Sequence, residues 1–144
     1  RDDFIFYTYP VSILPNLSGY VMLTMDAPLL SRADSQKGLF AIDATWYKAA
    51  KMEKSLREQD RIEEIELRSL PCGFKTAYPR RQEDCIDPER GLATVEAIYI
   101  ALKLMGRSTQ GLLDNYYWKE NFLHINQDLW KELDRIEGGI DGNN

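Results

Sequence analysis

This chain of 144 residues is poor in the residues that build metal and disulfide sites. It has two cysteines, Cys72 and Cys85, and a single histidine, His124. The cysteines lie 13 positions apart, with no Cys-x-x-Cys pair and no second histidine beside them. This spacing indicates neither a zinc site nor a disulfide framework. We therefore expect reduced thiols, no bound metal and a cytoplasmic setting.

The sequence also lacks long apolar runs. None reaches the roughly 18 to 20 residues that a membrane-spanning helix needs, so we expect no membrane partner. Hydrophobic residues make up 44% of the chain and charged residues 28%, which are ordinary values for a globular domain. We expect one domain over residues 1–137 and a disordered Gly- and Asn-rich tail over 138–144. Nothing at the start of the chain resembles a signal peptide. Because the first residue is Arg1 and not Met, we also expect that an N-terminal extension is missing.

Positive charge is scarce overall but is concentrated in one region. The formal net charge of −5 argues against loose, charge-driven attraction to nucleic acid. Residues 75–107 nevertheless contain a set of cations that could form one basic face: Lys75, Arg80, Arg81, Arg90, Lys103 and Arg107. Arg80 and Arg81 lie in a polar, non-periodic segment, where two guanidinium groups can bind a phosphate backbone. The alternative is that both are simply solvated.

The order of the elements predicts an α/β fold. Short apolar or alternating segments predict strands at 20–24, 39–42 and 64–67, and Ser31 to Asp34 has the chemistry of a capped turn. Helical spacing predicts helices at 45–57, from Thr94 to a stop at Gly106, around 112–117, and over 122–136. Strands alternating with helices favour a mostly parallel sheet, with a helical C-terminal third packed on it.

Asp43 follows the apolar run that ends at Ile42 and precedes Thr45 and Trp46. A carboxylate at the carboxyl end of a buried strand loses solvation unless something pairs with it. In open α/β sheets this edge is also where ligands bind. Asp43 is therefore a candidate for chemistry, and the alternative is that it only caps the following helix.

Three blocks of the sequence resemble a known superfamily. The first is Asp43-Ala44-Thr45-Trp46, preceded by Ser31-Arg32-Ala33-Asp34. The second is Leu70-Pro71, then Ala77-Tyr78-Pro79, then Leu92-Ala93-Thr94-Val95-Glu96-Ala97. The third is Trp118-Lys119-Glu120-Asn121-Phe122-Leu123-His124-Ile125-Asn126. In this order and spacing they resemble the RNA aminocarboxypropyltransferases, which comprise the DTW-domain proteins and the enzyme of small-subunit ribosomal RNA. The match differs at Ala93, where Ser is usual, and at Lys119, where Gly is usual.

The resemblance implies a SPOUT-like fold with a trefoil knot. It also implies S-adenosylmethionine as group donor and a uridine or pseudouridine in RNA as acceptor, with ribosomal RNA favoured over tRNA. Asp43 is then the candidate catalytic residue. The candidate donor-binding residues are Leu23, Thr24, Trp46, Leu70, Leu92, Ala93, Thr94 and Ala97. The candidate RNA contacts are Lys75, Arg80, Arg81 and Arg90.

Several of these residues have a plain structural alternative. Trp46 could belong to the core rather than to a ligand-binding wall, and Thr94 could be the N-cap of its helix, with Glu96 favourable in the first turn. Tyr116, Tyr117 and Trp118 could stack on bases or pack in the core. His124, which has no nucleophilic partner in sight, is expected to be structural.

Two other functions remain open at this point. One is a SPOUT-type RNA methyltransferase that uses the same donor. The other is a non-catalytic module that binds RNA or takes part in ribosome assembly. No Gly-rich phosphate loop, metal-ligand cluster or nucleophilic triad competes with these.

Overall fold

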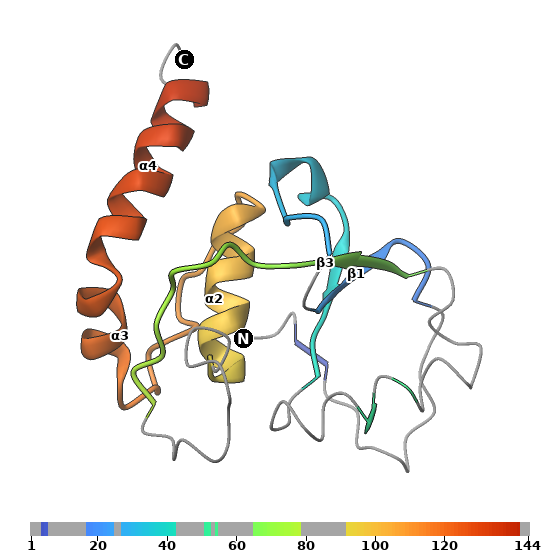
Figure 1. The fold of residues 1–144 in the computed structure, drawn as a ribbon, viewed down its shortest axis with the longest axis horizontal. Coiled ribbons are helices and arrows are strands. Elements are labelled where there is room, and N and C mark those ends of the chain that lie inside the picture. Colours follow the sequence, from blue (N-terminus) through green and yellow to red (C-terminus); the bar gives the residue numbers. More distant parts are fainter. Residues whose placement is uncertain are drawn as a thin grey trace.

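The computed structural model describes residues 4–5, 17–24, 27–42, 51–52, 54, 65–78 and 92–141, the last seven of these by backbone alone. Figure 1 shows the fold. In chain order its elements are β1 (Tyr20–Leu23), the 3₁₀ turn η1 (Arg32–Asp34), β2 (Gly38–Phe40), β3 (Glu66–Arg68), α2 (Thr94–Leu104), α3 (Lys119–Ile125) and α4 (Gln127–Asp141).

The three strands form one parallel sheet in the order β2-β1-β3. β1 pairs with β2 in the register Tyr20↔Gly38 and with β3 in the register Val21↔Glu66. The α/β class, the parallel sheet and the three predicted strands are therefore confirmed, with bounds shifted by one or two residues. Parallel strands bring their carboxyl ends to the same edge of the sheet.

β1 is the central strand because its middle residues are apolar on both faces. Val21 and Met22 are fully buried. Val21 packs with Ala101 and Met105 of the α2 region, whereas Met22 packs on the opposite face with Leu17 and Ile65. Alternation along a strand sends neighbouring side chains to opposite faces, so this one short strand contributes to two separate cores.

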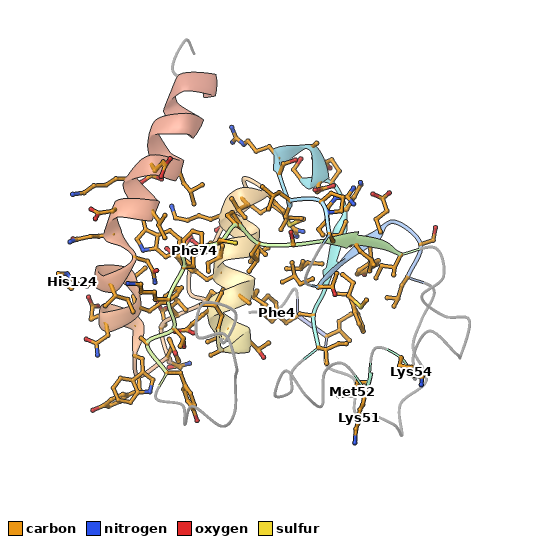
Figure 2. All side chains as sticks on the ribbon, viewed as in Figure 1. Phe4, Lys51, Met52, Lys54, Phe74 and His124 are labelled. Atoms are coloured by element: carbon orange, nitrogen blue, oxygen red, sulfur yellow. The ribbon has the colours of Figure 1, made fainter. Side chains whose placement is uncertain are left out.

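α2 lies between the sheet and the pair α3–α4 (Figure 1). Its residue Ile100 packs on the side away from the sheet, in a cluster with Phe74, Leu113, Phe122 and Trp130. Phe74 and Trp130 have ring centroids 5.0 Å apart, and Phe122 meets Trp130 edge to face at 5.6 Å. Figure 2 shows Phe74 inside this layer, between α2 and the C-terminal helices. Burial of these large rings is the main source of stability for the helical layer.

The helix predicted around 112–117 is wrong. Residues 110–115 form successive turns, in which Leu112 donates to the Thr109 carbonyl and Tyr116 to the Leu113 carbonyl. These hydrogen bonds join residues three apart, as in turns, and not four apart as in an α-helix.

The single helix predicted over 122–136 is divided in two. It breaks at Asn126, with φ −109° and ψ 14°, so that α3 ends at Ile125 and α4 starts at Gln127. α4 then continues to Asp141, which is into the segment predicted to be a disordered tail, and 142–144 lie outside the described residues. Of the predicted helix at 45–57, Lys51, Met52 and Lys54 are described and are helical. The trefoil knot stays a prediction, and residues 43–50 and 79–91 lie outside the described residues.

Candidate functional site

The candidate site begins at the carboxyl edge of the sheet. Leu23 ends β1 opposite Arg68 of β3, and the Thr24 N–H donates to the Arg68 carbonyl at 2.9 Å. β2 ends at Phe40 and the chain is described to Ile42, directly before Asp43. Leu23 and Thr24 thus lie at the edge where parallel sheets bind ligands. Asp43 and Trp46 lie outside the described residues.

Leu70 connects this edge to α2. It packs against the cluster of Val21 and Ala101 and also against the cluster of Ile100 and Phe122. Leu23 shares the first of these clusters and Leu92 the second. The structure thus places Leu23 and Thr24 at the sheet edge and Leu92, Ala93, Thr94 and Ala97 at the start of α2, with Leu70 packed against both clusters. All of them remain partly exposed, namely Leu23, Thr24, Leu70, Leu92, Ala93, Thr94 and Ala97. Partly exposed apolar residues are what a bound ligand could cover.

The start of α2 differs from the expected cap. The N-cap is Ala93, with φ −65° and ψ 152°, and Thr94 is the first helical residue. The alternative that Thr94 is the N-cap is therefore wrong, and its contact with the donor stays a prediction. Ala93 has no side-chain oxygen, so it cannot cap the helix in the way that the usual Ser would. The opposite half of a capping box is present, because Glu96 accepts a hydrogen bond from the Ala93 N–H at 2.8 Å.

Glu96 joins three segments of the chain. It is completely buried. Besides the Ala93 N–H, its carboxylate accepts the Thr76 hydroxyl at 2.5 Å, the Ala77 N–H at 2.8 Å and the Tyr116 hydroxyl at 3.0 Å. A buried carboxylate is tolerated when its oxygens are satisfied in this way. Glu96 thus fixes the helix start, the segment after β3 and Tyr116 relative to one another.

Asn126 holds the same segment from the other side. It is 1% exposed. Its Oδ1 accepts the Lys75 N–H at 2.8 Å, and its Nδ2 donates to the carbonyls of Lys75 and Phe122, each at 2.9 Å. An amide side chain can satisfy a backbone N–H and C=O together in this manner. The backbone from Lys75 to Ala77 is therefore anchored by one residue of α2 and by the junction of α3 and α4.

Asp34, which lies in η1 just before β2, is a third buried polar residue that joins separate segments of the chain. It is 2% exposed and accepts the Ser31 N–H at 3.2 Å, Lys37 Nζ at 3.0 Å and Arg68 Nε at 3.2 Å. Burial acts to raise the pKa of Asp34, but these hydrogen bonds outweigh it and hold the pKa below its ordinary value of 3.8. Lys37 also pairs with Glu66 at 2.8 Å. That pair raises the pKa of Lys37 and lowers the pKa of Glu66.

The candidate RNA contacts are only partly described. Lys75 has an exposed side chain on the backbone that Asn126 anchors. Arg80, Arg81 and Arg90 lie outside the described residues.

The aromatic group after α2 is not uniformly core. Tyr116 is partly buried and bonded to Glu96, whereas Tyr117 is 85% exposed. Trp118 meets Tyr117 edge to face at 4.6 Å. His124 is exposed, and Figure 2 shows its side chain on the outer side of α3, pointing away from α2.

Two further findings concern only the part of the chain that the structure describes. Within it, no group of three or more His, Cys, Asp or Glu is placed to hold a metal ion. No helix in these ranges is long and apolar enough to cross a membrane.

The chain is similar to proteins of a known family. The model of the DTW domain matches residues 9–126, which include the sheet, α2 and the Asn126 junction. The chain belongs to the DTW-domain family. No curated protein matches it. Among solved structures, it is similar to the SAM-dependent rRNA:acp-transferase Tsr3 from Vulcanisaeta distributa, with a TM-score of 0.63 and 28% identity over 90% of this chain and 67% of that one.

The three buried polar residues lie in the parts of the sequence that resemble the family. Among the described residues, Asp34, Glu96 and Asn126 are the ones that are polar and buried, and each belongs to one of the three blocks of resemblance. Sequence reasoning placed Glu96 in a favourable first turn but missed its contacts with Thr76 and Tyr116, and it gave Asn126 no role. The available signal was a polar residue inside an apolar helical pattern.

Proposed function

We propose that this protein transfers the 3-amino-3-carboxypropyl group of S-adenosylmethionine to a uridine or pseudouridine in RNA, ribosomal RNA rather than tRNA, in the cytoplasm. The observation that carries the proposal is the likeness to an rRNA:acp-transferase along 90% of the chain, together with membership of the DTW-domain family. The SPOUT-like knot is part of the proposal.

The described residues fit such a donor. Leu23, Leu70 and Leu92 are apolar and partly exposed at the strand ends and the helix start, where they would form a wall for the adenine ring and the methyl group, completed by Trp46. Thr24, Ala93, Thr94 and Ala97 would surround the ribose and the amino-acid arm. An apolar wall with a few polar groups is the usual composition of a small-molecule site.

The donor supplies an activated carbon. Attack by a ring nitrogen on the carbon chain breaks its bond to sulfur, returns the bonding pair to sulfur and releases methylthioadenosine. The protein must therefore decide which sulfur-bound carbon the nucleophile meets. The apolar wall would bury the methyl group and leave the chain accessible.

Asp43 would accept the proton of the attacking ring nitrogen or stabilise the sulfonium charge. Lys75, Arg80, Arg81 and Arg90 would bind phosphates and orient the RNA without reading its bases.

The test is an incubation of the protein with S-adenosylmethionine and ribosomal RNA, followed by mass analysis of the nucleosides. We expect a uridine or pseudouridine that carries the aminocarboxypropyl mass, together with free methylthioadenosine. A methyl adduct would instead make the protein a methyltransferase. Absence of donor binding in calorimetry at millimolar concentration would leave only a binding module.

Asp43→Asn supplies the matched variant. If Asp43 is the base, the variant should bind the donor like the wild type and transfer the group at least about 100-fold more slowly, as for the loss of a general base. Unchanged transfer by Asp43→Asn would show that Asp43 only caps its helix.

A further inference from the structure

Tyr117 presents an aromatic ring to solvent. At 85% it has the highest exposed fraction among the large apolar and aromatic side chains that the structure describes. Trp118 meets it edge to face, at an interplanar angle of 80°, which orients the ring and leaves it largely uncovered. Such exposure of a large ring calls for an explanation other than core packing.

The backbone that carries the ring is fixed on both sides. The Tyr116 N–H donates to the Leu113 carbonyl at 3.0 Å, and the Lys119 N–H to the Tyr116 carbonyl at 3.1 Å. The Tyr116 hydroxyl is bonded to the buried Glu96. A ring held on an ordered backbone loses little conformational entropy when a ligand covers it.

The position of Tyr117 relates it to the proposed donor site. Its neighbour in sequence, Tyr116, is linked to the start of α2 through the Glu96 carboxylate, which accepts both the Tyr116 hydroxyl and the Ala93 N–H. The same carboxylate holds the Ala77 N–H, next to Tyr78, whose side chain is 47% exposed. The backbone that carries Tyr117 is therefore tied, through Tyr116 and Glu96, to the helix start at which the donor is proposed to bind.

We propose that Tyr117 is a stacking platform for a base of the RNA substrate that flanks the modified nucleotide. This inference rests on the proposed function. The exposed neighbours along the chain, Asp114, Asn115, Glu120 and Asn121, are polar and do not form the contiguous apolar core of a protein interface. Asp114 and Glu120 are carboxylates and repel phosphates, so the ring would contact the face of a base and not the RNA backbone. A single accessible ring suits the planar face of a nucleobase, and such stacking is tolerant of sequence.

The test measures binding of a fluorescein-labelled, single-stranded oligoribonucleotide of mixed sequence by anisotropy, over a range of salt concentrations. We expect Tyr117→Ala to weaken binding by about 5-fold or more, as for the loss of one base–aromatic stack. Because stacking releases no counterions, the slope of log K against log salt should stay unchanged, whereas Lys75→Ala should reduce that slope. Tyr117→Phe keeps the ring and should bind like the wild type.

Ile125→Ala is the matched control, since Ile125 is a 44% exposed apolar residue nearby in sequence that lacks a ring; it should bind like the wild type. Equal binding by Tyr117→Ala and the wild type, or no binding by the wild type, would overturn the inference. Lower self-association of Tyr117→Ala in sedimentation, without an effect on RNA, would assign the ring to an interface between copies and also overturn it.

The outcomes separate this inference from the proposed function. If the wild type binds RNA through Tyr117 but transfers no group, the proposed function fails, and with it the position beside a modified nucleotide, while base stacking by Tyr117 stands. If the wild type transfers the group and Tyr117→Ala binds equally well, the platform fails and the proposed function stands.

Discussion

Glu96 combines complete burial with four hydrogen bonds from Thr76, Ala77, Ala93 and Tyr116. Each of its oxygens accepts one backbone N–H and one hydroxyl. Hydroxyl groups can rotate to suit a new neighbour, but backbone N–H groups cannot. The two backbone donors therefore make this position specific for a carboxylate.

Glu96→Gln tests that specificity. Whichever way the amide turns, its NH₂ group faces one of the two backbone N–H groups, and one buried donor is left without an acceptor. We expect the free energy of unfolding to fall by about 1–3 kcal/mol, measured by urea denaturation.

Glu120→Gln is the control, because it makes the same charge change at an exposed first-turn position of α3. It should alter stability by no more than about 0.5 kcal/mol. Equal effects of the two substitutions would mean that net charge matters and the hydrogen bonds of Glu96 do not.

At the scale of elements, the junction between α3 and α4 holds the segment that follows β3 in place. Asn126 interrupts the helical path and uses its side chain on the Lys75 backbone. The segment from 70 to 78 has no strand partner beyond the bridge at Ser69 among the described residues, so its polar groups need side chains to satisfy them. Its position thus depends on α2 and on the helix junction.

Asn126→Asp should destabilise the protein by about 1–3 kcal/mol or more, because two buried carbonyl oxygens would then face a carboxylate instead of an N–H donor. Hydrogen exchange gives a local measurement. The Lys75 amide should exchange faster in the variant, while the Met105 amide, bonded to Ala101 within the core, should change only with global stability.

Asn121→Asp introduces the same charge at an exposed position of α3 and should leave both measurements nearly unchanged. If Lys75 exchange were the same in Asn126→Asp and the wild type, the anchoring role of Asn126 would be refuted.

At the scale of the whole molecule, an ion-pair cluster connects η1 and the residue before β2 to strand β3. Its members are Asp34, Lys37, Glu66 and Arg68. Because the pKa of Asp34 is lowered in the folded protein, its stabilisation is fully present above the ordinary value of 3.8. It is lost as the pH falls from there through the lowered pKa. The raised pKa of Lys37 acts at the opposite end of the scale, where its stabilisation is present below pH 10.5 and is lost as the pH rises further.

Asp34→Asn should be less stable than the wild type at pH 7 by about 1–3 kcal/mol, and the difference should shrink as the pH is lowered past 3.8. Urea midpoints between pH 2.5 and 7 would measure this, with the exposed Asp128→Asn as control. A gap that stays constant with pH would show that the carboxylate charge of Asp34 is not what stabilises the fold.

The parts of the fold that depend on local pattern could be predicted from the sequence. The strand at Tyr20, the helix from Thr94 and its stop at Gly106, with φ +72°, follow from neighbouring residues. The break at Asn126 could not be predicted, because it depends on Lys75, 51 residues away. The turns before Tyr116 could not be predicted either, because an apolar pattern at helical spacing does not reveal that the backbone hydrogen bonds join residues three apart.

The candidate site, too, could be predicted from the sequence only in part. Leu23, Thr24 and Leu70 were named from the family resemblance, and the parallel sheet brings Leu23 and Thr24 to the edge formed by the carboxyl ends of its strands. The roles of all the candidate catalytic, donor-binding and RNA-binding residues stay predictions. Resemblance drew attention to the motifs but could not separate residues that touch a ligand from those that hold the backbone, such as Glu96.

The central position of β1 also governs how the molecule can assemble. Neither neighbour of β1 can pair with it as a hairpin, because both run parallel to it, and the β3 partner arrives only after a long stretch of intervening chain. The chain must therefore lose the entropy of closing a long loop before the hydrogen bonds between strands can stabilise the sheet. We expect the helical layer to acquire structure first on refolding and the sheet to set the slow, rate-limiting phase.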